Sequence, residues 1–221
     1  MEIWLDTANL SLIEQASKMG ILHGVTTNPS IVAKSNLSLE DLLQKIFSLQ
    51  SGPVTAQVTA LNAEEMIRQG KNLHKFSDQI IIKVPTTAEG LKAMRALSQA
   101  QIPVMATAIF DINQVLLAAH AKANYIAPYF SRICEDDMNG VNILKGMLSL
   151  LSRYSFSSKL IAASLHTAEQ VRECCEMGVH AVTLTDKVFC EIIGDHPQTV
   201  KSVNKFAKDW KEAKKNKTLE F

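Results

Sequence analysis

The sequence has almost no net charge, since its 221 residues carry 23 basic and 22 acidic side chains. Without a basic excess there is no overall field to attract nucleic acid or a membrane surface, so the balance favours a small metabolite as the partner. No run approaches the roughly 18 apolar residues of a membrane span, and the first residues lack a basic segment followed by an apolar stretch. We therefore predict a cytoplasmic protein that binds neither nucleic acid nor membranes.

Cysteine and histidine are too scattered to suggest a metal site. The four cysteines contain no C-x-x-C pair, and the six histidines show neither an H-x-x-x-H pair nor facial-triad spacing. Reduced thiols in a cytosolic protein are the plain interpretation. The sequence therefore predicts no metal and no cofactor.

The sequence contains no low-complexity linker and no repeat above the β/α unit, so we predict a single domain over residues 1–221. Short apolar runs alternate with segments of helical periodicity, which is typical of β/α units on a parallel sheet. Eight such runs favour a closed (β/α)8 TIM barrel over an open sheet. The expected strands are Ile3–Leu5, Gly24–Thr26, Val54–Val58, Ile80–Val84, Val104–Ala108, Tyr125–Ala127, Leu160–Ala163 and Ala181–Leu184.

Capping residues mark several expected helix ends. Ser38 and Thr167 precede segments that begin with acidic residues, as helix N-caps do. Gly20, Gly70 and Gly178 fall where helices are expected to end, each ahead of a strand.

Residues from about 197 to 215 are predicted to form an additional C-terminal helix. Val203, Phe206 and Trp210 lie on one helical stripe, and most of its lysines lie on others. Acidic residues interrupt the lysines, so a solvated face is favoured over a nucleic-acid patch. We expect the apolar stripe to pack on the barrel or on a neighbouring subunit.

Lys83 places one amine at the end of an expected strand, Ile80–Val84, that otherwise reads as fully buried. Apolar walls disfavour the ammonium form and raise the fraction of neutral, attacking amine, which Schiff-base chemistry on a carbonyl requires. The alternative is an ordinary strand-end lysine whose head reaches into water. Lys83 is nevertheless the best nucleophile candidate in the chain.

Polar residues follow most of the expected strands. Active sites of such barrels lie at the carboxyl ends of the strands, so these side chains are predicted to converge. Each also has a structural alternative. Asp6 could form a turn, Asn28 could belong to the turn ahead of a helix, and Gln57 could be a buried amide whose hydrogen bonds are all made within the core. The candidates are Asp6, Thr26, Asn28, Gln57, Lys83, Thr107, Tyr129, Arg132 and Ser164.

Two of these candidates suit a phosphate group. Arg132 offers a guanidinium fork and Ser164 a hydroxyl, which a phosphate monoester recruits. Ser164 also precedes an expected helix start, where main-chain N–H groups favour an anion. We therefore predict a small ligand that carries a phosphate monoester.

The mechanism follows from these residue types. After Lys83 attacks a ketone, the carbinolamine must lose water, which requires a positioned acid and base. The protonated imine then accepts electrons, so the bond between the carbons α and β to the former carbonyl can break and leave an enamine. The groups available for the proton transfers are Asp6, Gln57, Thr107 and Tyr129.

Five segments resemble the small transaldolases and fructose-6-phosphate aldolases, in the same order along nearly the whole chain. They are Leu5–Asn9, Gly24–Ser30 (GVTTNPS), Lys83–Pro85 with Glu89–Leu91, Ala127–Tyr129 with Arg132, and Ala162–Ser164. The resemblance implies a (β/α)8 barrel in which Lys83 forms the Schiff base and Asp6 is an acid/base group. It also implies that Asn28 contacts the dihydroxyacetone portion or the imine, and that Arg132 and Ser164 hold the phosphate. Members of this size tend to form rings, which implies a pentamer or decamer joined through the C-terminal helix.

Two activities share this scaffold. An aldolase protonates the enamine and releases dihydroxyacetone, whereas a transaldolase keeps it until a second aldose arrives. Transaldolases of the family resemble one another in having glutamate where this chain has Gln57 and phenylalanine where it has Tyr129, and aldolases resemble this chain at both positions. Because a phenol can deliver a proton to the enamine carbon, we predict cleavage of fructose 6-phosphate to dihydroxyacetone and glyceraldehyde 3-phosphate, with transaldolase as the alternative.

One position departs from the family pattern. After Ser164 the chain reads Leu165-His166, where similar aldolases have an aromatic residue then lysine and transaldolases an aliphatic residue then arginine. Histidine would be a weaker phosphate ligand at neutral pH.

Overall fold

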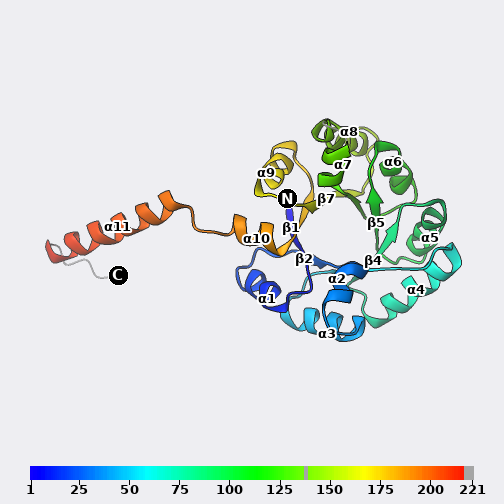
Figure 1. The fold of residues 1–221 in the computed structure, drawn as a ribbon, viewed down its shortest axis with the longest axis horizontal. Coiled ribbons are helices and arrows are strands. Elements are labelled where there is room, and N and C mark those ends of the chain that lie inside the picture. Colours follow the sequence, from blue (N-terminus) through cyan, green and yellow to red (C-terminus); the bar gives the residue numbers. More distant parts are fainter. Residues whose placement is uncertain (137–138, 217–221) are drawn as a thin grey trace. The chain divides into compact units, whose positions relative to one another are not determined.

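The computed structural model describes residues 1–136 and 139–216, and within them parallel strands close into a barrel in sequence order, β1 to β8 (Figure 1). Pairing of β1 with β8 completes the ring. The predicted (β/α)8 barrel is confirmed, and the strand ends differ from the expected ones by at most two residues. The strands are β1 (Glu2–Asp6), β2 (Gly24–Thr26), β3 (Val54–Gln57), β4 (Ile80–Pro85), β5 (Val104–Ile109), β6 (Tyr125–Pro128), β7 (Lys159–Leu165) and β8 (Ala181–Leu184).

Helices surround the barrel between Met1 and Phe189 (Figure 1). Several of them start at a side chain that accepts a hydrogen bond from a first-turn N–H, and Ser38 and Thr167 cap helices as expected. The helices are α1 (Leu10–Lys18), α2 (Pro29–Lys34), α3 (Leu39–Leu49), α4 (Ala63–Phe76), α5 (Ala88–Gln99), α6 (Ile112–His120), α7 (Phe130–Asp136), α8 (Gly140–Arg153), α9 (Ala168–Met177), α10 (Asp186–Ile192) and α11 (Pro197–Asn216).

The glycine positions are only partly as expected. Gly178 ends α9 with a φ of 76°, and Gly20 follows α1 with a φ of 71°. The prediction for Gly70 is wrong, because this residue lies inside α4. A Cβ there would meet the methyl groups of Leu97 at 3.0 Å and that of Ile82 at 3.2 Å. Glycine at this position therefore allows α4 to approach α5 and β4 closely.

The expected C-terminal helix is present as α11. It belongs to a second compact unit that starts at Cys190, separate from the unit formed by Met1–Phe189. Val203 and Phe206 on its apolar stripe are exposed. The packing of this stripe on the barrel or on a neighbouring subunit stays a prediction. The single domain over residues 1–221 also stays a prediction.

Side chains fill the inside of the barrel in layers. One layer is a buried apolar cluster that includes Trp4, Ile81, Met105, Ile161 and Ala181. Successive side chains of a strand point to opposite faces, so a residue two positions further along points into the same interior. The next layer toward the carboxyl ends therefore contains polar side chains from four of these strands, namely Asp6, Lys83, Thr107 and Thr183.

The amino-terminal end of the barrel is closed by hydrogen bonds to Glu2. Its carboxylate accepts hydrogen bonds from Trp4 Nε1 and from the Tyr125 hydroxyl, each at 3.0 Å, and pairs with Lys159. Burial alone raises the pKa of Glu2, but the hydrogen bonds from Lys159, Trp4 and Tyr125 outweigh it and hold the pKa below its ordinary value. Folding therefore favours the ionised carboxylate.

Replacing Glu2 with glutamine is expected to lower the free energy of unfolding at neutral pH by about 1–3 kcal/mol. The reason is that Trp4, Tyr125 and Lys159 would then face a neutral amide in place of a carboxylate. Since the folded-state pKa is lowered, the stabilisation is complete above the ordinary value of 4.5 and is lost as the pH falls through the folded-state pKa. Denaturant unfolding at pH 7 and pH 3 measures this. The difference between the two proteins should shrink at pH 3, and an unchanged difference would contradict the assignment.

Candidate active site

Lys83 is buried near the carboxyl end of β4, with 3% of its surface exposed. Its Nζ donates a hydrogen bond to the main-chain oxygen of Thr27 at 3.2 Å. The amine therefore does not extend into bulk water, and it lies in the polar layer above the apolar cluster. The burial of the side chain is as predicted for Lys83, and its role as a nucleophile stays a prediction.

The main-chain carbonyl of Thr27, which accepts the hydrogen bond from Lys83, is held in place by two hydrogen bonds between Thr27 and Thr55. The Thr27 N–H donates to Thr55 Oγ1 at 3.0 Å, and Thr27 Oγ1 donates to the Thr55 oxygen at 2.6 Å. Both residues are buried. Thr27 follows β2 in the segment noted for its polar strand end, whereas Thr55 was not predicted, because a threonine inside a strand reads as a strand former. Together they fix the position of the Lys83 amine.

Asp6 lies in the same polar layer and is oriented by a chain of hydroxyl groups. Thr26 Oγ1 donates to Asp6 Oδ1 at 2.7 Å and lies 2.6 Å from Thr183 Oγ1. Since Thr26 gives its only hydroxyl hydrogen to Asp6, Thr183 donates to Thr26. Thr26 is fully buried and its hydroxyl donates to Asp6, while its predicted contact with substrate stays a prediction. Thr183 was not predicted.

Asn28 caps α2, because its side-chain oxygen accepts a hydrogen bond from the Ile31 N–H at 3.0 Å. Its amide NH2 group is therefore the part that can donate to a substrate. Asn28 immediately follows Thr27, whose carbonyl binds Lys83. The Asn28 side chain therefore starts beside the carbonyl that binds Lys83, and its contact with the imine stays a prediction.

Thr107 and Tyr129 form the opposite part of the polar layer. The Thr107 hydroxyl is buried and lies 3.2 Å from the Tyr129 hydroxyl. The half-buried Tyr129 ring makes an edge-on contact with Phe110 at 5.6 Å between ring centroids. The Arg132 guanidinium lies over the same ring, 5.2 Å from its centroid. The structure therefore holds a phenol at the mouth with its hydroxyl directed to Thr107.

Arg132 and Ser164, which we call the anion rim, come from adjacent elements. Arg132 is exposed on α7, which packs against β7, and Ser164 lies on β7. Ser164 has a φ of 58°, unusual for a residue other than glycine, at a shift in the β7–β8 register. Nearby, His166 Nδ1 lies 3.9 Å from Glu135 Oε1, and both side chains are exposed.

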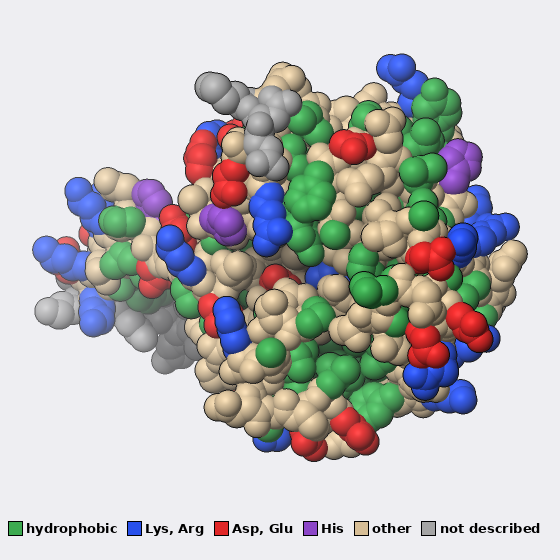
Figure 2. Space-filling model, turned by 45° about the vertical axis from the view of Figure 1, so that its right-hand side comes forward, with side chains coloured by type: hydrophobic (Ala, Val, Ile, Leu, Met, Phe, Trp, Pro, Cys, Tyr) green, Lys and Arg blue, Asp and Glu red, His purple; other side chains and the backbone are tan. Residues whose placement is uncertain are grey.

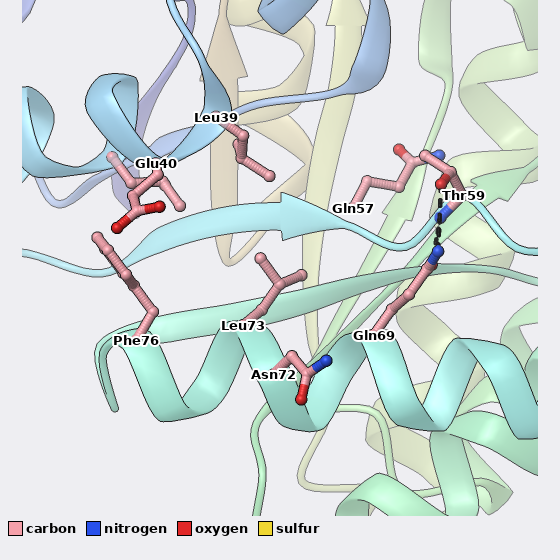
Figure 3. A pocket seen from close by; sticks show the side chains of 9 residues that line it. Leu39, Glu40, Gln57, Thr59, Gln69, Asn72, Leu73 and Phe76 are labelled. Carbon is pink, nitrogen blue, oxygen red and sulfur yellow. Dashed lines mark hydrogen bonds between the residues drawn. The ribbon is translucent and has the colours of Figure 1, made fainter.

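Gln57 is paired in register with Lys83 on the neighbouring strand. It lines a cavity of about 260 Å³ together with Thr27 and Asn28. It also borders a groove of about 440 Å³ between α3 and α4, where Leu73 and Phe76 form an apolar wall (Figure 3). No lysine among the described residues lines that groove, so the Schiff-base chemistry proposed below is better placed on the Lys83 side of Gln57.

The structure also bears on the predictions about metal ions, membranes and nucleic acid. Within the described ranges, no group of three or more His, Cys, Asp or Glu residues is arranged to hold a metal ion. In the same ranges, no helix is both long and apolar enough to span a bilayer. The face in Figure 2 shows basic and acidic side chains interspersed around a central hollow. The predicted absence of nucleic-acid binding stays a prediction.

A family model described as "Transaldolase/Fructose-6-phosphate aldolase" matches residues 3–220. The chain belongs to this family. A "Probable transaldolase" from Geobacillus kaustophilus is 40% identical over 97% of this chain and 100% of its own length. Another from Streptococcus equi subsp. equi is 36% identical with the same coverages. The predicted family is thereby confirmed, and the protein is an enzyme of the transaldolase/aldolase family.

Solved structures add a likeness of fold. A mandelate oxidase mutant with an FMN adduct matches with a TM-score of 0.58 at 14% sequence identity, covering 82% of this chain and 62% of that one. At this identity the likeness concerns the barrel alone.

Proposed function

We propose that this protein is a Schiff-base aldolase that cleaves fructose 6-phosphate to dihydroxyacetone and glyceraldehyde 3-phosphate, and catalyses the reverse addition. The observation that carries the choice is the Tyr129 hydroxyl beside Thr107, in the barrel mouth that also contains Lys83. An aldolase must protonate the enamine, and a phenol held at the mouth can supply that proton.

The first half of the reaction forms the imine. The neutral Lys83 amine attacks the ketone carbon, and the resulting carbinolamine loses its hydroxyl as water after proton transfer. Asp6 is the carboxylate available for this transfer, and the hydrogen bond from Thr26 orients it. Arg132 and Ser164 bind the phosphate at the other end of the sugar.

The second half breaks a carbon–carbon bond. A base, for which Asp6 is positioned, removes the proton of the C4 hydroxyl, and the C3–C4 bond breaks as glyceraldehyde 3-phosphate leaves. The bonding electrons move into the imine to form an enamine. Tyr129 then delivers a proton to C3, and hydrolysis of the imine releases dihydroxyacetone and restores Lys83.

The second candidate is a transaldolase, which transfers dihydroxyacetone between sugar phosphates. It is favoured by the curated relatives, several of which are named probable transaldolases at 36–40% identity. The two candidates share every step up to the enamine. They differ only in whether a proton or a second aldose reacts with C3.

A coupled assay for glyceraldehyde 3-phosphate release from fructose 6-phosphate distinguishes the two candidates. We expect the purified protein to release the product at a similar rate with and without erythrose 4-phosphate, because protonation needs no acceptor. Release that depends strictly on erythrose 4-phosphate would instead establish the transaldolase.

We further propose that the protein is cytoplasmic and forms a pentamer or decamer through the C-terminal helix. The support for the oligomer is the exposed apolar stripe of α11, which includes Val203 and Phe206. Such a stripe is stabilised when a second surface covers it.

A further inference from the structure

Gln170 in α9 joins two segments of the barrel mouth. Its side-chain oxygen accepts a hydrogen bond from the Ser131 hydroxyl at 2.8 Å and another from the His166 N–H at 2.8 Å. Ser131 belongs to α7, and His166 follows β7. A single carbonyl oxygen, which has two acceptor sites, therefore ties the first turn of α7 to the loop after β7.

Arg132 lies in the first of these segments, and Ser164 lies at the end of the strand that leads into the second. Arg132 directly follows Ser131, and Ser164 lies two residues before His166. In Figure 1, α7 and α9 lie on either side of β7. The contact of Gln170 with Ser131 and His166 therefore links the main chain that carries Arg132 to the loop that follows Ser164.

The Ser131 contact is costly to lose. Ser131 is 2% exposed, and its hydroxyl donates to Gln170. A buried hydroxyl without a partner is destabilising, so removal of the Gln170 oxygen favours a shift of α7 that lets Ser131 find another acceptor. Such a shift would move Arg132 with it.

Two other glutamines show what is particular to Gln170. The Gln69 side-chain oxygen accepts from the N–H groups of Thr59 and Ala60, in the loop just before its own helix (Figure 3). Gln114 does the same for the loop before α6. Gln170 closes its own loop in this way through His166, but it also reaches Ser131 in the preceding β/α unit.

We propose that Gln170 is a positioning residue that holds Arg132 and Ser164 at the separation at which both bind the same phosphate group. This inference rests on the proposed function, because that function supplies a phosphorylated substrate. Gln170 itself need not touch the substrate. Its effect is on phosphate recognition and not on imine chemistry at Lys83.

The test compares aldol addition of dihydroxyacetone to glyceraldehyde 3-phosphate and to unphosphorylated glyceraldehyde. Gln170→Met keeps the side-chain length but removes the acceptor oxygen. We expect the KM for glyceraldehyde 3-phosphate to rise about tenfold, since small misplacements of binding groups have effects of this order. The rate with glyceraldehyde and the KM for dihydroxyacetone should stay within about twofold of wild type.

Two further variants separate positioning from general damage to the fold. Ser131→Ala removes only the contact between α7 and α9, and we expect it to shift the same KM in the same direction. In the double variant the effects should not add, because both changes break one contact. Gln69→Met is the matched control, since it loosens a comparable loop on another part of the barrel and should leave the preference for the phosphorylated acceptor unchanged.

A second measurement does not depend on turnover. Inorganic phosphate should raise the melting temperature of the wild type, because a ligand that binds the folded state stabilises it, and this shift should fall at least by half in Gln170→Met and Ser131→Ala. If the wild type is inactive with both acceptors but the variants lose the phosphate shift, the proposed function fails and the role of Gln170 stands. The role is overturned if the phosphate shift is absent from the wild type or unchanged in the variants, or if both acceptors are affected equally.

Discussion

Lys83→Met is expected to lower the rate of fructose 6-phosphate cleavage by roughly four orders of magnitude, because removing a covalent nucleophile removes the pathway it opens. Methionine has a similar length and suits an apolar site, so the barrel should remain folded. In the wild type, borohydride should reduce the imine and add mass to the peptide that contains Lys83. The variant should show no such addition.

A matched control for this substitution is Lys92→Met. Lys92 lies on the helix that follows β4, its side chain is 68% exposed, and it pairs with Glu89 on the surface. Exposed ion pairs contribute little to stability, so this variant should keep wild-type cleavage and trapping. Mass trapped on another lysine, or full activity in Lys83→Met, would remove the basis of the proposed mechanism.

Tyr129→Phe is expected to lower cleavage without an acceptor by about 10²- to 10³-fold, the range for a lost proton donor. The ring that packs against Phe110 and beneath Arg132 is kept, so only the hydroxyl near Thr107 is lost. Transfer to erythrose 4-phosphate uses the enamine before it is protonated and should fall less than tenfold. Product release measured with and without acceptor gives both rates.

Tyr154→Phe provides the control for this change, because Tyr154 is 66% exposed at the carboxyl end of α8. It should leave both rates unchanged. Equal losses of cleavage and transfer in Tyr129→Phe would mean that the phenol acts before the enamine forms. Tyr129 would then no longer favour the aldolase over the transaldolase.

The fold was predictable because its signals are local. The apolar run before Lys83 reads as a buried strand without knowledge of its neighbours, and the acceptor side chain of Thr167 marks a helix start within three residues. Gly70 was misjudged because the reason for a glycine there is contact with Leu97 and Ile82, which are distant in the sequence.

The candidate site was predictable in residue type but not in arrangement. The strand-end positions of Asp6 and Lys83 follow from strand periodicity and barrel geometry. Thr183 could not be found this way, because it contacts Thr26 across 157 residues and only after β8 pairs with β1. Gln170 likewise reads as an ordinary helical residue until α7 is placed beside it.

The sequence by itself determined the order of strands and helices, the family and the set of polar side chains at the strand ends, because hydrophobic periodicity and residue type are properties of each segment. Only the tertiary structure decided which hydroxyl groups orient Asp6, which carbonyl binds the Lys83 amine and which side chain joins the two parts of the anion rim. These are hydrogen bonds between segments distant in the sequence, and their geometry exists only once the barrel closes.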